Sequence, residues 1–202
     1  MGNPLDSSLV IRLCRSTDIA AIARLNNEAI ETGWAHFGTE PVPAHEMGAL
    51  WESGRETYPW LIAETPGESG SESGPAFAGF AKAGVWKPRG GYRWTTEVGL
   101  YLKPSAQGRG IGTALYAKLF EFLSAQGFVV AFGGVATPNP ASERLHESVG
   151  MTVAGDFEPS GYKLGAWRPV RYYVKVLNDH ADGLEPAPTL PVSAVAAGVL
   201  GG

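Results

Sequence analysis

The segment from Leu100 to Leu115, LYLKPSAQGRGIGTAL, passes from a strand pattern through glycines at 108, 110 and 112 into a helical pattern. Glycine lets the backbone approach a ligand closely, and a helix N-terminus offers unpaired N–H groups and the positive end of the helix dipole. We therefore expect an anion-binding turn, with phosphate as the simplest ligand. The spacing matches neither a dinucleotide fingerprint, since Thr113 replaces the third glycine, nor a P-loop. From spacing alone, a plain turn before a helix stays an alternative.

Two further residues have the chemistry to move protons. Glu97 lies in a strand pattern and shares one face with Gly99 and Tyr101. A carboxylate whose pKa is raised by burial can act as a general base, and the alternative is a solvated strand carboxylate. His146 lies in a helical pattern, where the sequence alone allows a helix-surface histidine or a core histidine, and imidazole, which titrates at about pH 6.5, could also carry a proton.

The remaining reactive side chains do not indicate a metal or a covalent intermediate. His36, His45 and His180 have no metal-ligand spacing, and Cys14 is the single cysteine. The sequence contains no Gly-x-Ser-x-Gly nucleophile elbow. We therefore predict no metal and no covalent enzyme intermediate. The lone cysteine and the lack of a signal-peptide pattern favour a reducing, cytoplasmic location.

The glycine turn resembles a known signature. The run Gln107-Gly108-Arg109-Gly110-Ile111-Gly112 is similar to the Gln/Arg-x-x-Gly-x-Gly/Ala motif of the GNAT superfamily of acetyl-CoA-dependent N-acetyltransferases. Residues 139 to 151 resemble that family's Asn-x-x-Ser helix. The resemblance implies that amides of the turn bind the pyrophosphate of coenzyme A and that Asn139 contacts its pantetheine arm. The cofactor site implied in this way comprises Leu100, Tyr101, Leu102, Gln107, Gly108, Arg109, Gly110, Ile111, Gly112, Thr113, Asn139 and Ser142.

Further motifs between residues 9 and 177 resemble the phosphinothricin N-acetyltransferase branch of that superfamily. They begin at Phe37, Tyr58, Trp86, Tyr92, Leu145 and Gly161. The resemblance implies that Glu97 is the general base that deprotonates the acceptor ammonium and that His146 protonates the departing thiolate. The implied acceptor site comprises Phe37, Lys87, Arg89, Tyr92 and Tyr101. Departures from residues common in the branch occur at Gly38, Arg93, Leu164 and Arg168.

These features predict an acetyl-CoA-dependent N-acetyltransferase that acts on a small amino acid or analogue of the phosphinothricin or methionine sulfoximine type. Transfer is expected to be direct, within a ternary complex. The branch also suggests a homodimer, with the aromatic segment from Trp167 to Tyr173 suited to an interface. Two alternatives are a GNAT enzyme that acetylates a peptide or protein amine and a non-catalytic acyl-CoA-binding sensor.

The elements that must position these residues alternate between strand and helix periods. Strand patterns cover 9–14, 60–63, 77–85, 94–103, 128–135, 151–157 and 171–177. Helical patterns cover 19–30, 44–55, a segment from 111 that stops at Gly127, and a segment from Pro140, with Asn139 as its N-cap. This order predicts an α/β (α+β) fold with a mixed central sheet flanked by helices on both faces.

Length and composition set the outer limits of the prediction. The 202 residues suffice for one domain with a proper core, and the net charge of −4 argues against a nucleic-acid partner. The longest apolar run, at 192–200, is too short to span a bilayer, so we expect no membrane partner. We expect one GNAT domain over 1–177, with a flexible turn at 65–75. A disordered tail is expected over 178–202, which lacks aromatic residues.

Overall fold

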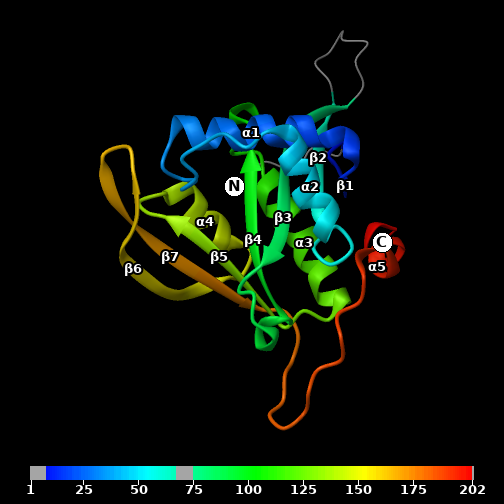
Figure 1. The fold of residues 1–202 in the computed structure, drawn as a ribbon. Coiled ribbons are helices and arrows are strands. Elements are labelled where there is room, and N and C mark those ends of the chain that lie inside the picture. Colours follow the sequence, from blue (N-terminus) through cyan, green and yellow to red (C-terminus); the bar gives the residue numbers. More distant parts are fainter. Residues whose placement is uncertain (1–7, 67–74, 202) are drawn as a thin grey trace.

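The structure is a computed structural model that describes residues 8–66 and 75–201. Its strands form a single sheet of seven, in the order β1-β2-β3-β4-β5-β7-β6 (Figure 1). They are Val10–Leu13 (β1), Trp60–Thr65 (β2), Ala76–Val85 (β3), Thr95–Leu102 (β4), Val130–Ala136 (β5), Thr152–Lys163 (β6) and Ala166–Val176 (β7). The helices are Ile19–Thr32 (α1), Ala44–Gly54 (α2), Ile111–Gln126 (α3), Pro140–Ser148 (α4) and Val192–Leu200 (α5). Among these described strands, β4 and β5 are the one pair that runs parallel, so the sheet is mixed, as predicted.

Alternating side chains divide the core between the two faces of the sheet. On β2, Leu61 and Ala63 belong to an apolar cluster that includes the buried side of α3. The intervening Trp60 and Ile62 belong to a second cluster with α1 and α2. Successive strand residues point to opposite faces, so one strand serves both layers. The prediction of helices on both faces is thereby confirmed (Figure 1).

The two closing strands are longer than the sequence pattern predicts. The expected spans were 151–157 and 171–177, whereas β6 continues to Lys163 and β7 begins at Ala166. Leu164 and Gly165, at φ of 52° and 77°, turn the chain between them. The sequence pattern did not indicate a strand over this part of β6, because Pro159 and the polar residues around it interrupt the alternation of apolar residues. A proline is tolerated there because β6 is an edge strand and its ladder with β7 is interrupted between Phe157 and Gly161.

The structure differs from the predicted disordered tail over 178–202, because residues 192–200 form α5 and the segment before it is hydrogen-bonded to the body. Val192, only 4% exposed, joins the apolar cluster of α3, and α5 lies beside α3 (Figure 1). The buried side chain of Gln126 donates to the Leu190 carbonyl at 2.8 Å, and the Leu190 N–H donates to the Gln126 carbonyl at 2.8 Å. Trp94 Nε1 donates to the Ala187 carbonyl at 2.7 Å. Hydrogen bonds to the backbone of the segment and the burial of Val192 therefore hold a segment that contains no aromatic residue of its own.

The expected flexible turn at 65–75 lies mostly outside the described residues, which exclude 67–74. Thr65 ends β2 and Ala76 begins β3, and the two strands pair directly with each other. Among the described residues, none of the helices is both long and apolar enough to cross a membrane.

Candidate active site

The central parallel pair of strands opens into a fork at Glu97. The β4–β5 ladder contains three pairs, and the last of them joins Glu97 to Phe132. Beyond this pair β4 continues to Leu102 and β5 to Ala136, with no further pairing between these described segments. One backbone edge of β4 therefore faces the gap between the diverging strands. Glu97 lies at the point where the two strands separate.

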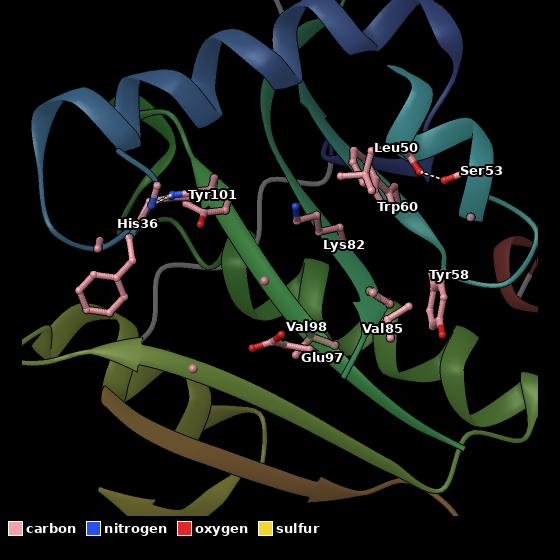
Figure 2. Close-up of a pocket in the computed structure, with 18 residues that line it drawn as sticks. His36, Leu50, Ser53, Tyr58, Trp60, Lys82, Val85, Glu97, Val98 and Tyr101 are labelled. Atoms are coloured by element: carbon pink, nitrogen blue, oxygen red, sulfur yellow. Dashed lines mark hydrogen bonds between the residues drawn. The ribbon is translucent and has the colours of Figure 1, made fainter. Parts of the chain in front are cut away.

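A cavity of about 540 Å³ lies at this fork, on the face of the sheet covered by α1 and α2 (Figure 2). Gly84 of β3 and Gly99 of β4 open its floor, since a Cβ added at either position meets nothing within 4 Å. Glu97 and Tyr101 enter from β4, and Lys82 enters from β3. The loop after α1 contributes Ala35, His36, Phe37 and Gly38.

The surroundings of Glu97 change its acidity in the direction a base requires. Burial raises the pKa of its carboxyl above the usual value, while the positive charges of Lys87 and Lys82 oppose that rise. The net shift is upward. A carboxylate with a raised pKa is a stronger base than a solvated glutamate. Glu97 is thus a partly buried, titratable group facing a cavity, rather than a solvated strand residue.

Tyr101 forms one end of the cavity. Its ring stacks on Phe80 at a centroid distance of 5.4 Å and lies 5.8 Å from the ring of His36. Burial, and to a smaller extent the charge of Glu97, raises the pKa of Tyr101 to about 12. The phenol therefore stays protonated at neutral pH.

The glycine turn between β4 and α3 has the geometry of an anion cradle. Gly108 and Gly110 have φ of 71° and 78°, a left-handed conformation that side chains disfavour, and Gly110 is the N-cap of α3. The turn residues 107–110 are exposed, so they are accessible to a ligand. Gly112 has a different role: a Cβ there would lie 3.2 Å from Leu145, so it allows α3 and α4 to pack closely.

The other residues of the predicted cofactor site surround this turn. Gln107 Nε2 donates to the Leu102 carbonyl at 3.3 Å, which ties the turn to the end of β4. Leu100, Tyr101 and Leu102 form the diverging part of β4, whereas Ile111 is buried in the first turn of α3. Thr113 Oγ1 lies 3.5 Å from Ser148 Oγ at the end of α4. Arg109 is exposed within the turn itself. An exposed turn that leads into a helix N-terminus fits an anionic group such as a pyrophosphate.

The start of α4 is formed as the sequence predicts. The side chain of Asn139 accepts a hydrogen bond from the Ser142 N–H at 3.2 Å, and Glu143 accepts one from the Asn139 N–H at 2.9 Å. These reciprocal bonds fix the N-terminus of the helix. The Asn139 N-cap is therefore confirmed.

His146 is a buried residue of the core. It is 4% exposed, its ring lies 5.3 Å from that of Tyr116 and 5.1 Å from that of Tyr173, and it does not line the cavity. Burial lowers the pKa of His146, so the neutral ring is favoured. Nδ1 lies 2.7 Å from the Ser142 carbonyl and donates to it, which leaves Nε2 to accept from the Tyr116 hydroxyl at 3.3 Å. This geometry favours the core-histidine alternative over an imidazolium acid.

The cationic loop before β4 does not enter the cavity. Lys87, Arg89 and Tyr92 are exposed, and none of them is among the residues that line it. The charge of Lys87 nevertheless acts on Glu97. Arg93 forms an ion pair with Glu185 and lies over the ring of Trp94, so it holds the C-terminal segment.

Sequence reasoning missed Lys82, which is the one lysine or arginine among the described residues that line the cavity. Its Nζ lies 5.1 Å from the centre of the Trp60 ring. The available signal was a single lysine within the small and apolar run FAGFAKAGV of β3. A charged residue in a central strand is uncommon unless it is paired or serves a site.

Comparison with known proteins gives the family. Residues 20–151 match the model of the Acetyltransferase (GNAT) family. The chain is 37% identical, over 92% of its length and 93% of the relative, to a phosphinothricin N-acetyltransferase of Streptomyces viridochromogenes. It is 31% identical, over 86% of its length and 97% of the relative, to an L-methionine sulfoximine/L-methionine sulfone acetyltransferase of Salmonella typhimurium. The chain belongs to the GNAT acetyltransferase family.

A solved structure supports the same assignment. A GNAT superfamily phosphinothricin acetyltransferase from Sinorhizobium meliloti, solved in complex with acetyl-CoA, superimposes with a TM-score of 0.78 at 26% sequence identity. The match covers 91% of this chain and 95% of that one. The predicted GNAT fold is therefore confirmed.

Proposed function

We propose that this enzyme transfers the acetyl group of acetyl-CoA to the amino group of a small amino acid or analogue, of the phosphinothricin or methionine sulfoximine type. The observation that carries the proposal is the position of Glu97, at the fork of β4 and β5 and on the wall of a cavity of about 540 Å³. The relatives named for phosphinothricin and methionine sulfoximine support the acceptor class.

The chain's own residues supply the binding and the proton transfer. The turn at Gly108 and Gly110 and the N-terminus of α3 would hold the pyrophosphate, and the free backbone edge of β4 would face the acyl arm. Acetyl-CoA supplies an acetyl group that its thioester activates. Glu97 accepts the proton that the acceptor ammonium must lose before its nitrogen can attack. Backbone N–H groups of β4 would polarise the thioester oxygen.

We propose that His146 packs in the core and takes no direct part in proton transfer. Its neutral ring is held by the Ser142 carbonyl and accepts from Tyr116, so a proton for the departing thiolate would have to pass through another group. A direct general-acid role, as the family resemblance implies, predicts a pKa near or above neutral. The hydrogen bonds that engage both ring nitrogens, together with the lowered pKa, argue against that role.

Two wider features of the proposal concern assembly and location. Phe157, Tyr162, Leu164 and Trp167 on the β6–β7 hairpin are each more than half exposed, which supports a homodimer formed through this hairpin. Tyr173 is fully buried, so only the Trp167 end of the predicted aromatic segment is available for an interface. A cytoplasmic location is supported by the free, buried Cys14.

An acceptor panel tests the function. Purified enzyme is incubated with acetyl-CoA and with phosphinothricin, methionine sulfoximine, methionine sulfone, spermidine, kanamycin or a short peptide, and thiol release is recorded with the mass of the product. The proposal expects acetylation of the amino-acid analogues well above the cationic amines and the peptide. Higher kcat/KM on the peptide would favour the peptide or protein acetyltransferase alternative, and no turnover on any amine would favour a sensor.

A further inference from the structure

Lys82 occupies an unusual electrostatic position in the cavity. It lies opposite Gly99 on β4 and opposite Trp60 on β2, so it shares the cavity face with Glu97, which is two residues before Gly99. Such diagonal neighbours on adjacent strands lie roughly 7–8 Å apart at Cα. Lys82 and Glu97 therefore place a cationic side chain and a base on the same wall of the cavity.

Lys82 forms no ion pair within the described part of the chain, although the charge of Glu97 acts on it and opposes the fall in its pKa. Its contact is with the ring of Trp60, and no ion pair joins it to Glu97 in the described part of the chain. Figure 2 shows the Lys82 side chain extending toward the side of Tyr101 and His36 rather than toward Glu97. Burial lowers the pKa of Lys82 because the charged form is costly to remove from water, and an anion that enters the cavity favours that charged form.

The other titratable groups around Lys82 do not supply that anion. Burial raises the pKa of Tyr101, which keeps the phenol neutral. Burial, together with the charges of Lys82 and Lys163, lowers the pKa of His36, which keeps its imidazole neutral. Glu97 is the one carboxylate on this wall, and its proposed role requires it to face the acceptor amine.

We infer that Lys82 is a specificity-determining residue that binds an acid group on the side chain of the acceptor, while Glu97 faces the amine of the same molecule. The inference rests on the proposed function. An α-carboxylate is attached to the carbon that carries the amine and must stay close to Glu97. A side-chain acid can instead reach the end of the cavity toward which Lys82 extends. Lys82 thus has the role in acceptor binding that the sequence suggested for Lys87 and Arg89.

Two acceptors of nearly equal shape isolate the charge. L-Phosphinothricin ends in a methylphosphinate anion, and L-methionine sulfone carries a neutral methylsulfone at the same distance from its amine. Initial rates are measured with both acceptors, at saturating acetyl-CoA, for the wild type, Lys82→Met and Lys82→Arg. Lys118→Met is the matched control, because Lys118 lies on α3, on the opposite side of the sheet, and pairs with Glu121.

The expected result is a change in selectivity. Lys82→Met should lower kcat/KM for phosphinothricin at least 10-fold, mainly through KM, and change that for methionine sulfone less than 3-fold. Lys82→Arg should keep most of the wild-type preference, and Lys118→Met all of it. Equal losses on both acceptors, or an unchanged ratio, would overturn the inference even if the enzyme acetylates both. A wild type that acetylates neither acceptor would instead refute the proposed function.

Discussion

The C-terminal helix gives the prediction with the clearest magnitude. Val192, at 4% exposure, is the buried residue of α5, and its N–H donates to the Glu56 carbonyl at 2.7 Å. Glu56 lies in the turn between α2 and β2, whose neighbours Gly54 and Tyr58 line the cavity. The helix therefore supports both the body of the protein and one wall of the proposed acceptor site.

Val192→Ala removes two buried carbon atoms. At about 0.8 kcal/mol for each buried methylene, the transfer free energy lost is about 1.6 kcal/mol. Incomplete collapse of the resulting cavity raises the loss in unfolding free energy to about 2 kcal/mol. In a chain of this size, that corresponds to a decrease in melting temperature of about 4–8 °C.

The assay is denaturant unfolding followed by circular dichroism, with melting temperature as a second measure. Leu184→Ala is the matched control, because Leu184 lies in the same C-terminal segment and is 75% exposed. We expect that control to change the unfolding free energy by less than about 0.5 kcal/mol. If Val192→Ala proves as stable as the wild type, or no worse than Leu184→Ala, α5 is not docked on α3 and the reasoning is refuted.

Three further predictions concern the cofactor turn, the buried histidine and the hairpin. Gly110→Val should weaken acetyl-CoA binding at least 10-fold by calorimetry, or about 1.4 kcal/mol. Gly183→Val is the control, because Gly183 has the same left-handed backbone away from the turn, and it should bind acetyl-CoA as the wild type does. If Gly110→Val binds acetyl-CoA as tightly as the wild type, the turn is not the anion-binding site. Because the pKa of His146 is lowered in the folded state, its contribution to the free energy of unfolding is present above pH 6.5 and is lost as pH falls through the lowered pKa. Urea unfolding at pH 7.5 and 5.5 should therefore show a smaller change in the free energy of unfolding for His146→Gln than for the wild type. An equal change in the two proteins would contradict the buried neutral ring. Trp167→Glu should shift the protein from dimer to monomer in sedimentation, and an unchanged mass would exclude this hairpin as the interface.

The sequence predicted the helices and strands that have a clear hydrophobic period and distinct residues at their start and end. The glycines around α3 and the Asn139-Pro140 start of α4 specify local backbone geometry, so their effect is visible without tertiary information. The second half of β6 was missed because Pro159 breaks the pattern. Helix α5 was missed because its stability comes from Gln126 and the apolar side of α3, which are distant in sequence.

The candidate site was predictable in part for the same reason. The position of Glu97 followed from strand alternation and a family motif, and the fork then explains why this carboxylate faces a cavity. Burial of His146 depends on Tyr116 and Tyr173, which only the folded chain brings together. Lys82 was overlooked because its importance arises from cross-strand register with Gly99, which a single strand pattern does not reveal.

The central claim is tested most directly by the rate of N-acetylation of phosphinothricin by the wild type and Glu97→Gln, measured as product mass and thiol release across pH. The account predicts an N-acetylated product from the wild type, and a turnover about 10²-fold lower for Glu97→Gln with acetyl-CoA affinity nearly unchanged. Because burial raises the pKa of Glu97, the wild-type rate should rise with pH as that carboxyl loses its proton. The loss in the variant should shrink at high pH, where solvent supplies free amine. A Glu97→Gln enzyme as active as the wild type at neutral pH would contradict the account.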